Sequence, residues 1–146
     1  MRALPTILAL SITLLASCKQ HSGIVTTPQS VQQDIFLTNA GTLNSTLSRW
    51  SVRIDEISER AKVTQHTGTV AASVEVPNWR AQPGWFACVG ADERVWVYDG
   101  QTNLCIVETN ASGGTVIFGL STYPRPVPLA IRNRLSSAAQ QLLKHE

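Results

Sequence analysis

Charged side chains are scarce in this 146-residue chain. Asp, Glu, Lys and Arg together make up 15% of the residues, and the formal net charge is only +2. A chain so close to neutral has no long-range field that would attract nucleic acid, whose binding depends on many phosphate contacts. We therefore expect no nucleic-acid partner.

Recognisable catalytic and metal-binding motifs are also lacking. The three histidines, His21, His66 and His145, have no metal-ligand spacing to another histidine, to a cysteine or to a carboxylate. No serine stands in a Gly-x-Ser-x-Gly elbow, and the sequence contains no glycine-rich phosphate loop. Because neither a nucleophile nor a base can be named, we expect a non-enzyme without metal or cofactor.

An apolar run long enough to span a membrane is missing as well. The apolar stretch from Ile7 to Leu15 is shorter than the ~20 residues that a spanning helix needs. It follows the single positive charge of Arg2 and precedes small residues and Cys18. This order is typical of a signal peptide, which is removed from the mature protein.

The end of this segment, Leu15-Ala16-Ser17-Cys18, resembles the lipobox of bacterial lipoproteins. The resemblance covers the signal peptide only. It implies that the Cys18 thiol receives a diacylglycerol and that cleavage makes Cys18 the new N-terminus, with palmitate or a similar acyl chain holding the protein to a membrane. Lys19 is not the aspartate that commonly retains lipoproteins in the inner membrane, so the resemblance favours the outer membrane, facing the periplasm. The alternative is an ordinary secretory signal in which Cys18 is incidental.

The sequence thus divides into three parts. Residues 1–17 form the predicted lipoprotein signal peptide, and residues 18–30 comprise the lipidated cysteine and a flexible tether with Gly23 and Pro28. Residues 31–146 have the length of a single domain, which we assign to the α+β class.

The first half of that domain carries a helical pattern. Its apolar residues are spaced by alternating steps of four and three, which predicts a long N-terminal amphipathic helix from about residue 31 to Ala61: Phe36, Ala40, Leu43, Leu47, Trp50, Ile54, Ile57 and Ala61. Gly41 and several Ser and Thr residues weaken its first half. The same spacing fits a coiled coil, but the flanking positions lack the opposite charges that would pair two helices. Packing against a sheet is therefore the favoured alternative.

From residue 69 the period changes to two. After residues 70–76, four short strands are predicted within residues 85–119, separated by turns such as Asp99-Gly100. This spacing is typical of an antiparallel meander sheet of four or five strands. A stripe at Ile131, Leu135, Ala138 and Leu142 predicts a C-terminal helix over residues 129–144.

Two cysteines remain after Cys18, and their pairing depends on the sheet. With centred turns, Cys88 lies opposite Val95 and Cys105 lies opposite Val97. The two cysteines then flank one middle strand at roughly 9–10 Å, whereas a disulfide needs Cα atoms within ~7 Å. The meander predicts two buried thiols; an exported protein with one cysteine pair leaves a disulfide as the alternative.

One face of this predicted sheet gives the strongest indication of function. Its centre is apolar although its rim is mixed, and a large exposed apolar patch usually marks an interaction site. We therefore expect an envelope interaction or assembly module that binds an unknown envelope protein through this candidate face: Trp85, Trp96, Tyr98, Ile106 and Ile117. The structural alternative is that helices cover both faces of the sheet.

Two other functions stay open. The protein could carry a small ligand or lipid in a cleft between helix and sheet. It could also inhibit an external hydrolase through loops near Trp79-Arg80 or Asp92-Glu93.

Overall fold

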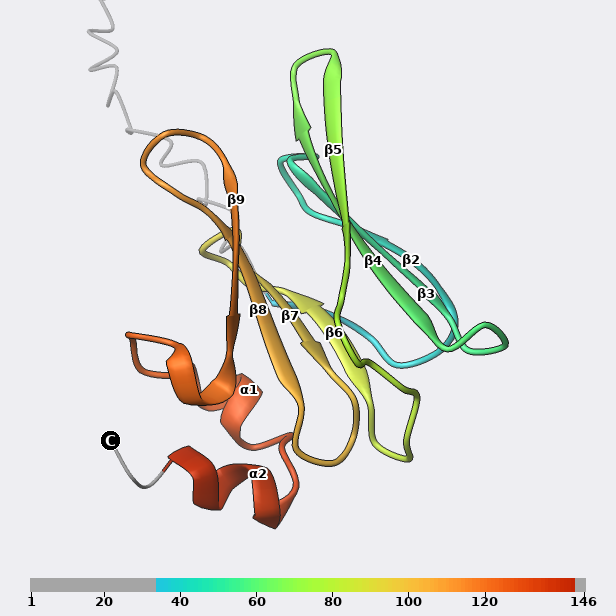
Figure 1. Ribbon diagram of the computed structural model, residues 1–146, viewed down its shortest axis with the longest axis vertical. Helices are drawn as coiled ribbons and strands as arrows, with labels where there is room; N and C mark the ends of the chain where they lie inside the picture. The colour runs from blue at the N-terminus through green and yellow to red at the C-terminus, as the bar shows by residue number, and fades with distance from the viewer. Residues whose placement is uncertain (1–33, 144–146) are drawn as a thin grey trace, which may run out of the picture. The chain divides into compact units, whose positions relative to one another are not determined.

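The computed structural model describes residues 34–143, which fold into two antiparallel sheets (Figure 1). Sheet A has the strand order β1-β6-β7-β8-β9 and consists of β1 (Ile35–Leu37), β6 (Phe86–Val89), β7 (Val95–Tyr98), β8 (Leu104–Thr109) and β9 (Thr115–Gly119). Sheet B has the order β2-β3-β4-β5 and consists of β2 (Gly41–Asn44), β3 (Trp50–Asp55), β4 (Arg60–Thr67) and β5 (Val70–Glu75). The predicted α+β class is therefore wrong, because the described chain is mostly β.

The predicted long N-terminal helix is replaced by β1 to β3 and the start of β4. Trp50, Val52 and Ile54 alternate with polar residues along β3 and are all buried, which is the period of a strand. Two members of the apparent helical stripe, Leu47 and Ile57, lie in turns and are 55% and 99% exposed. The steps of four and three arose because turn residues were counted together with core residues.

The turn between β2 and β3 shows why the polar residues there do not continue a helix. The Ser45 hydroxyl accepts hydrogen bonds from the backbone N–H groups of Arg49 (2.9 Å) and Trp50 (3.0 Å). Ser48 has a positive φ of 54°. Short polar side chains that bond to nearby backbone favour turns over helices, as this serine does.

The first core lies between the two sheets. Inward-facing side chains of sheet B pack against those of sheet A in one buried cluster that includes Trp50, Val52, Ile54, Val63, Ala87, Val95, Val97, Cys105 and Val107. Such burial contributes about 25 cal/mol per Å² of apolar surface, so this layer supplies much of the stability of a two-sheet fold.

The second core lies on the opposite face of sheet A, under the C-terminal segment (Figure 1). This segment contains the 3-10 helix η1 (Leu120–Thr122) and the short helices α1 (Leu129–Arg132) and α2 (Ser137–Leu142). Its buried side chains Tyr123, Ile131, Leu135 and Ala139 pack on the strands.

The single predicted C-terminal helix is thus divided into two. The hydroxyl of Ser136 accepts a hydrogen bond from the N–H of Ala139 (3.2 Å) and so starts α2. The same residue binds the sheet, because its N–H donates to the Tyr98 hydroxyl (3.1 Å) and its own hydroxyl donates to the Gln101 carbonyl (2.5 Å). A serine cap of this kind begins a new helix where the chain changes direction.

The meander β6–β9 is confirmed, but its register differs from the prediction by one residue at β6. Val89 pairs with Val95 across the five-residue turn 90–94, so Cys88 lies opposite Trp96 and not opposite Val95. Glu93 adopts a positive φ of 60° in this turn. A shift of one residue moves every side chain of a strand to the other face.

The two cysteines consequently lie on opposite faces of sheet A. Cys105 faces sheet B and Cys88 faces the C-terminal segment, and both are buried free thiols. Side chains on opposite faces of a sheet point apart, which rules out a disulfide between them.

Both thiols should be unreactive in the native protein. Burial raises the pKa of Cys88 to about 12 and that of Cys105 to about 11, so both remain protonated at pH 8, and the thiolate is the reactive form. In a Cys18→Ala chain at pH 8, a thiol reagent should label neither cysteine before unfolding and both in denaturant. Rapid native labelling of either cysteine, or fewer than two thiols in denaturant, would contradict this arrangement.

Candidate binding groove

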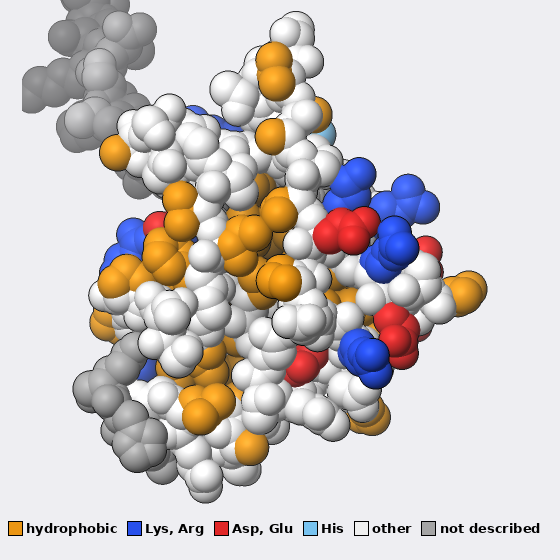
Figure 2. Space-filling model, in the orientation of Figure 1, with side chains coloured by type: hydrophobic (Ala, Val, Ile, Leu, Met, Phe, Trp, Pro, Cys, Tyr) orange, Lys and Arg blue, Asp and Glu red, His pale blue; other side chains and the backbone are white. Residues whose placement is uncertain are grey.

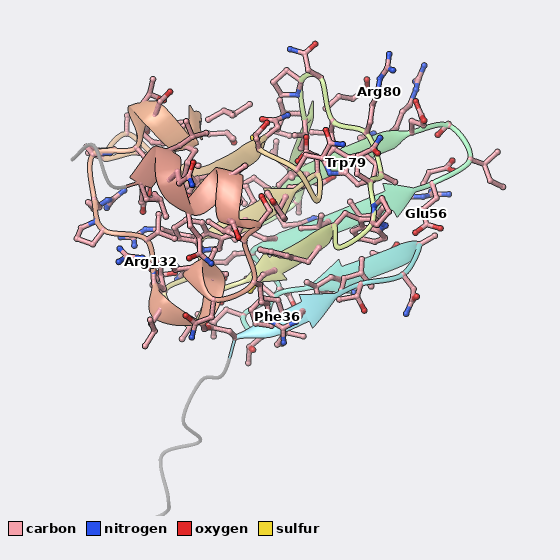
Figure 3. All side chains as sticks on the ribbon, turned by 90° about the horizontal axis from the view of Figure 1, so that it is seen from below. Phe36, Glu56, Trp79, Arg80 and Arg132 are labelled. Carbon is pink, nitrogen blue, oxygen red and sulfur yellow. The ribbon has the colours of Figure 1, made fainter. Side chains whose placement is uncertain are left out.

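A groove of about 750 Å³ opens at the end of the sheets where β3 meets β4 and where β6 begins. We call it the Glu56–Arg134 groove, and its lining residues are Thr38, Glu56, Ala81, Gln82, Pro83, Gly84, Trp85, Phe86 and Arg134. Figure 3 shows that neighbouring side chains come from separate elements, with Phe36 on β1, Glu56 on the β3–β4 turn, and Trp79 and Arg80 on the segment before β6. The volume is within the range of sites for small ligands and short peptides.

The β3–β4 turn forms one wall, and hydrogen bonds to Asp55 stabilise it. One carboxylate oxygen of Asp55 accepts hydrogen bonds from the backbone N–H groups of Ile57 (3.0 Å) and Ser58 (3.1 Å). The bonds from Ser58, followed by those from Ile57 and the charge of Arg53, lower the pKa of Asp55, although slight desolvation opposes them. Glu59 completes the turn with a φ of 51°.

The adjoining wall is the segment between β5 and β6, which has no regular structure but is firmly anchored. The indole N–H of Trp85 donates to Glu56 (2.9 Å), and the Trp85 ring meets that of Trp79 edge to face at 5.7 Å. Trp79 is buried and donates to the Tyr98 carbonyl (3.4 Å). Gln82 donates its N–H to the Asp99 carbonyl (2.9 Å).

Close contact between that segment and the β7–β8 turn requires a glycine. A Cβ on Gly100 would lie 2.6 Å from the Gln82 carbonyl oxygen, and the residue has a φ of 96°. Any other residue would be strained and would push the Gln82 backbone away from the turn.

The third wall carries a guanidinium stacked on an aromatic ring. The Arg134 guanidinium carbon lies 4.0 Å from the centroid of the Phe36 ring, and Phe36 meets Phe86 edge to face at 5.6 Å. Arg134 follows α1, and its N–H donates to the Ile131 carbonyl (2.9 Å). The two hydrogen bonds of Ser136 to the sheet hold this turn in place. Stacking of this kind fixes the plane of a guanidinium without using its N–H groups.

The two charged groups of the groove, Glu56 and Arg134, are exposed to solvent. Within residues 34–143, the carboxylate of Glu56 forms no ion pair, and neither does Arg134. On the nearby outer face of sheet B, by contrast, Arg60 pairs with Glu75 at 3.4 Å, and Figure 2 shows acidic and basic side chains intermixed there. The groove therefore offers one cation and one anion to a ligand.

The groove residue Glu56 is followed in the chain by an exposed apolar residue, Ile57. Ile57, at the tip of the β3–β4 turn, is 99% exposed, although its backbone is fixed by Asp55. Covering this side chain with another molecule would remove its apolar surface from water, which is favourable.

The five residues of the sequence-predicted interaction face are not together at the surface. Trp96, Tyr98 and Ile106 are buried in the second core beneath the C-terminal segment. Ile117, on the edge strand β9, is 36% exposed, and Trp85 is the one member that lines the groove. The lipid-anchor residue Cys18 lies outside the described residues.

Sequence reasoning missed Glu56, Ile57 and Arg134. The available signal was the run Asp55-Glu-Ile-Ser-Glu59, in which an aspartate begins a polar segment typical of a turn. No sequence spacing indicates that Arg134 reaches Phe36, because the two residues are far apart in the chain.

The loops considered for inhibition have structural partners. Arg80 is exposed and lies 3.9 Å from Glu59. Asp92 pairs with Arg94 (2.6 Å), which also contacts Glu108 (3.2 Å), and Arg125 binds the same Glu108 carboxylate. This network ties the β6–β7 turn to β8 and to the chain after η1.

Comparisons of the chain with protein-family models, with curated proteins and with solved structures found no match. No group of three or more His, Cys, Asp or Glu side chains in residues 34–143 is arranged to hold a metal ion. None of the helices in that range has both the length and the apolar character required to cross a bilayer.

Proposed function

We propose that this protein is a lipid-anchored, non-catalytic binding module of the bacterial envelope. Its anchor is lipid on Cys18, its place is the outer membrane facing the periplasm, and its domain binds an envelope protein through the Glu56–Arg134 groove. The lipobox resemblance supports the anchor. The groove replaces the apolar sheet face as the proposed contact, because the C-terminal segment covers that face.

The observation that carries the binding proposal is the exposure of Ile57 on a fixed turn. Burying an isoleucine side chain contributes about 1.5–3 kcal/mol. Since Asp55 already fixes the turn, little conformational entropy is lost when a partner covers it. The exposed Ile57 and the groove residues Glu56 and Arg134 together offer an apolar contact and two charges to a partner.

Small-ligand binding is the second candidate, and the groove volume of about 750 Å³ favours it. Lipid carriage has less support, because the space between sheet A and the C-terminal segment is filled by the protein's own side chains, among them Trp96, Tyr98 and Ile106. If the protein partner is an external hydrolase, the outcome of binding is inhibition, which an activity assay detects.

Photo-crosslinking in cells tests the proposed contact. A crosslinking amino acid at position 57 or 82 should trap the same protein, whereas one at Ser112, in the exposed β8–β9 turn, should not. Ile57→Asp should reduce the adduct from position 82 at least about tenfold, because the 1.5–3 kcal/mol of apolar burial is lost, without changing thermal stability. Identical adduct patterns from positions 57, 82 and 112 would contradict the proposal.

A further inference from the structure

The Arg134 side chain is arranged to receive an anion. Its guanidinium carbon lies over the Phe36 ring, 4.0 Å from the centroid, and a cation–π contact of this kind leaves the N–H groups available to a ligand. Within residues 34–143, no acidic side chain pairs with it. A guanidinium with free in-plane donors binds a carboxylate through two parallel hydrogen bonds, a geometry that lysine cannot reproduce.

The Glu56 carboxylate can accept a hydrogen bond from a ligand or pair with a cation. One of its oxygens accepts the indole N–H of Trp85 (2.9 Å), which fixes the side chain in the groove wall. The second oxygen keeps its capacity to accept hydrogen bonds, and the negative charge has no cationic partner in residues 34–143. A ligand would therefore be held here by presenting a hydrogen-bond donor, such as a peptide N–H, or a cation to this carboxylate.

The groove between these two groups excludes several ligand classes. A polyanion such as a nucleotide would be repelled by Glu56. A sugar would lack an open aromatic face, because Trp85 is only 8% exposed and packs on Trp79. The lining between the charges includes the small or apolar residues Ala81, Pro83 and Gly84, of which Pro83 and Gly84 are exposed, and such a lining suits a peptide.

We infer that the Glu56–Arg134 groove binds a short peptide that ends in a free carboxylate. The terminal carboxylate pairs with Arg134, and a peptide N–H or an amine of the same ligand donates to Glu56. This inference rests on the proposed binding function and specifies its chemistry. The peptide has two sources in an envelope: the C-terminus of a protein, made of L-residues, and the peptides of the cell wall, which contain D-residues.

Peptide binding to the full lipidated chain in detergent micelles tests the inference. The probes are fluorescently labelled Ala-Ala-Ala with a free carboxylate, the same peptide as its C-terminal amide, and Ala-D-Ala-D-Ala. We expect at least one free-carboxylate probe to bind at least about tenfold more tightly than the amide, as measured by fluorescence anisotropy. Preference for the L- or the D-form identifies the source, and equal binding supports the shared chemistry.

Two matched arginine variants distinguish binding by Arg134 itself from a general effect of the positive charge of the protein. Arg134→Gln should weaken carboxylate binding at least about tenfold. Arg132→Gln, an exposed arginine on α1 that does not line the groove (Figure 3), should leave it unchanged. Glu56→Gln, which preserves an acceptor for Trp85, should weaken binding severalfold. Unchanged thermal unfolding of each variant shows that the fold is retained.

Three outcomes would overturn the inference: no binding of either carboxylate peptide, equal binding of carboxylate and amide, or equal effects of Arg132→Gln and Arg134→Gln. The crosslinking experiment tests the proposed function independently of peptide binding. If crosslinks from positions 57 and 82 persist while the peptides do not bind, the binding module stands and its ligand chemistry is wrong.

Discussion

Replacing Cys18 by alanine should move the protein from the membrane to the aqueous phase. The lipobox resemblance implies a diacylglycerol on this thiol, and each buried methylene would contribute about 0.8 kcal/mol to membrane binding. A single acyl chain binds marginally, whereas two or more hold a protein to the bilayer almost irreversibly. We therefore expect nearly complete partition of the wild type into the detergent phase of a temperature-induced phase separation, and of Cys18→Ala into the aqueous phase.

The matched controls are the other two cysteines. Cys88→Ala and Cys105→Ala remove buried thiols that lie in the two cores of the domain, so they should not alter partition. Radiolabelled palmitate should enter the wild type and both of these variants, but not Cys18→Ala. A wild-type chain that carries no label, or whose mature form still begins at Met1, would remove the anchor from the proposed function.

The strands from β6 to β9 could be predicted because short-range chemistry determines them. Each apolar run is bounded by turn residues, and Asp99 fixes its turn by accepting hydrogen bonds from the N–H groups of Gln101 (2.8 Å), Thr102 (3.2 Å) and Asn103 (3.1 Å). The pairing of Val97 with Cys105 across this turn was correct. The turn 90–94 is one residue longer than the prediction assumed. Each side chain of β6 therefore points to the face opposite to the predicted one.

The predicted helix failed because two periods overlapped in the same residues. Trp50, Val52 and Ile54 have the spacing of a strand, while Trp50, Ile54 and Ile57 have that of a helix. Burial decides between them: Val52, which the helical stripe omits, is fully buried, and Ile57, which the stripe includes, is almost fully exposed. The β-branched residues, Thr among them, favoured the strands, and the serines disfavoured a helix.

The candidate groove could not be predicted because its walls come from turns. Glu56 and Arg134 lie in or next to tight turns, and Trp85 lies at the end of an irregular segment. Such residues have no periodicity, and the contact of Arg134 with Phe36 depends on how the C-terminal segment crosses sheet A. Trp85 was included in the predicted site because the predicted strand 85–89, with its register one residue off, placed it on the same face as Trp96.

Trp96→Ala should lower the free energy of unfolding by about 3–5 kcal/mol, the usual cost of removing a buried aromatic side chain. Trp96 is fully buried, lies between Cys88 and Ile106 across sheet A, and meets the ring of Tyr123 edge to face at 5.4 Å. Because a domain of this size has a total stability of about 5–15 kcal/mol, the loss should be obvious in urea unfolding followed by tryptophan fluorescence.

Trp96→Phe keeps an aromatic ring in the same position and should lose only about 1–3 kcal/mol, so it provides a folded variant if the alanine chain does not fold. Ile57→Ala is the surface control and should change stability by less than about 0.5 kcal/mol. If Trp96 were a docking residue, the result would be reversed: its replacement would leave stability unchanged and abolish partner crosslinks from position 57. A loss of stability with crosslinks retained in Trp96→Phe would agree with Trp96 in the core and the partner contact at the groove.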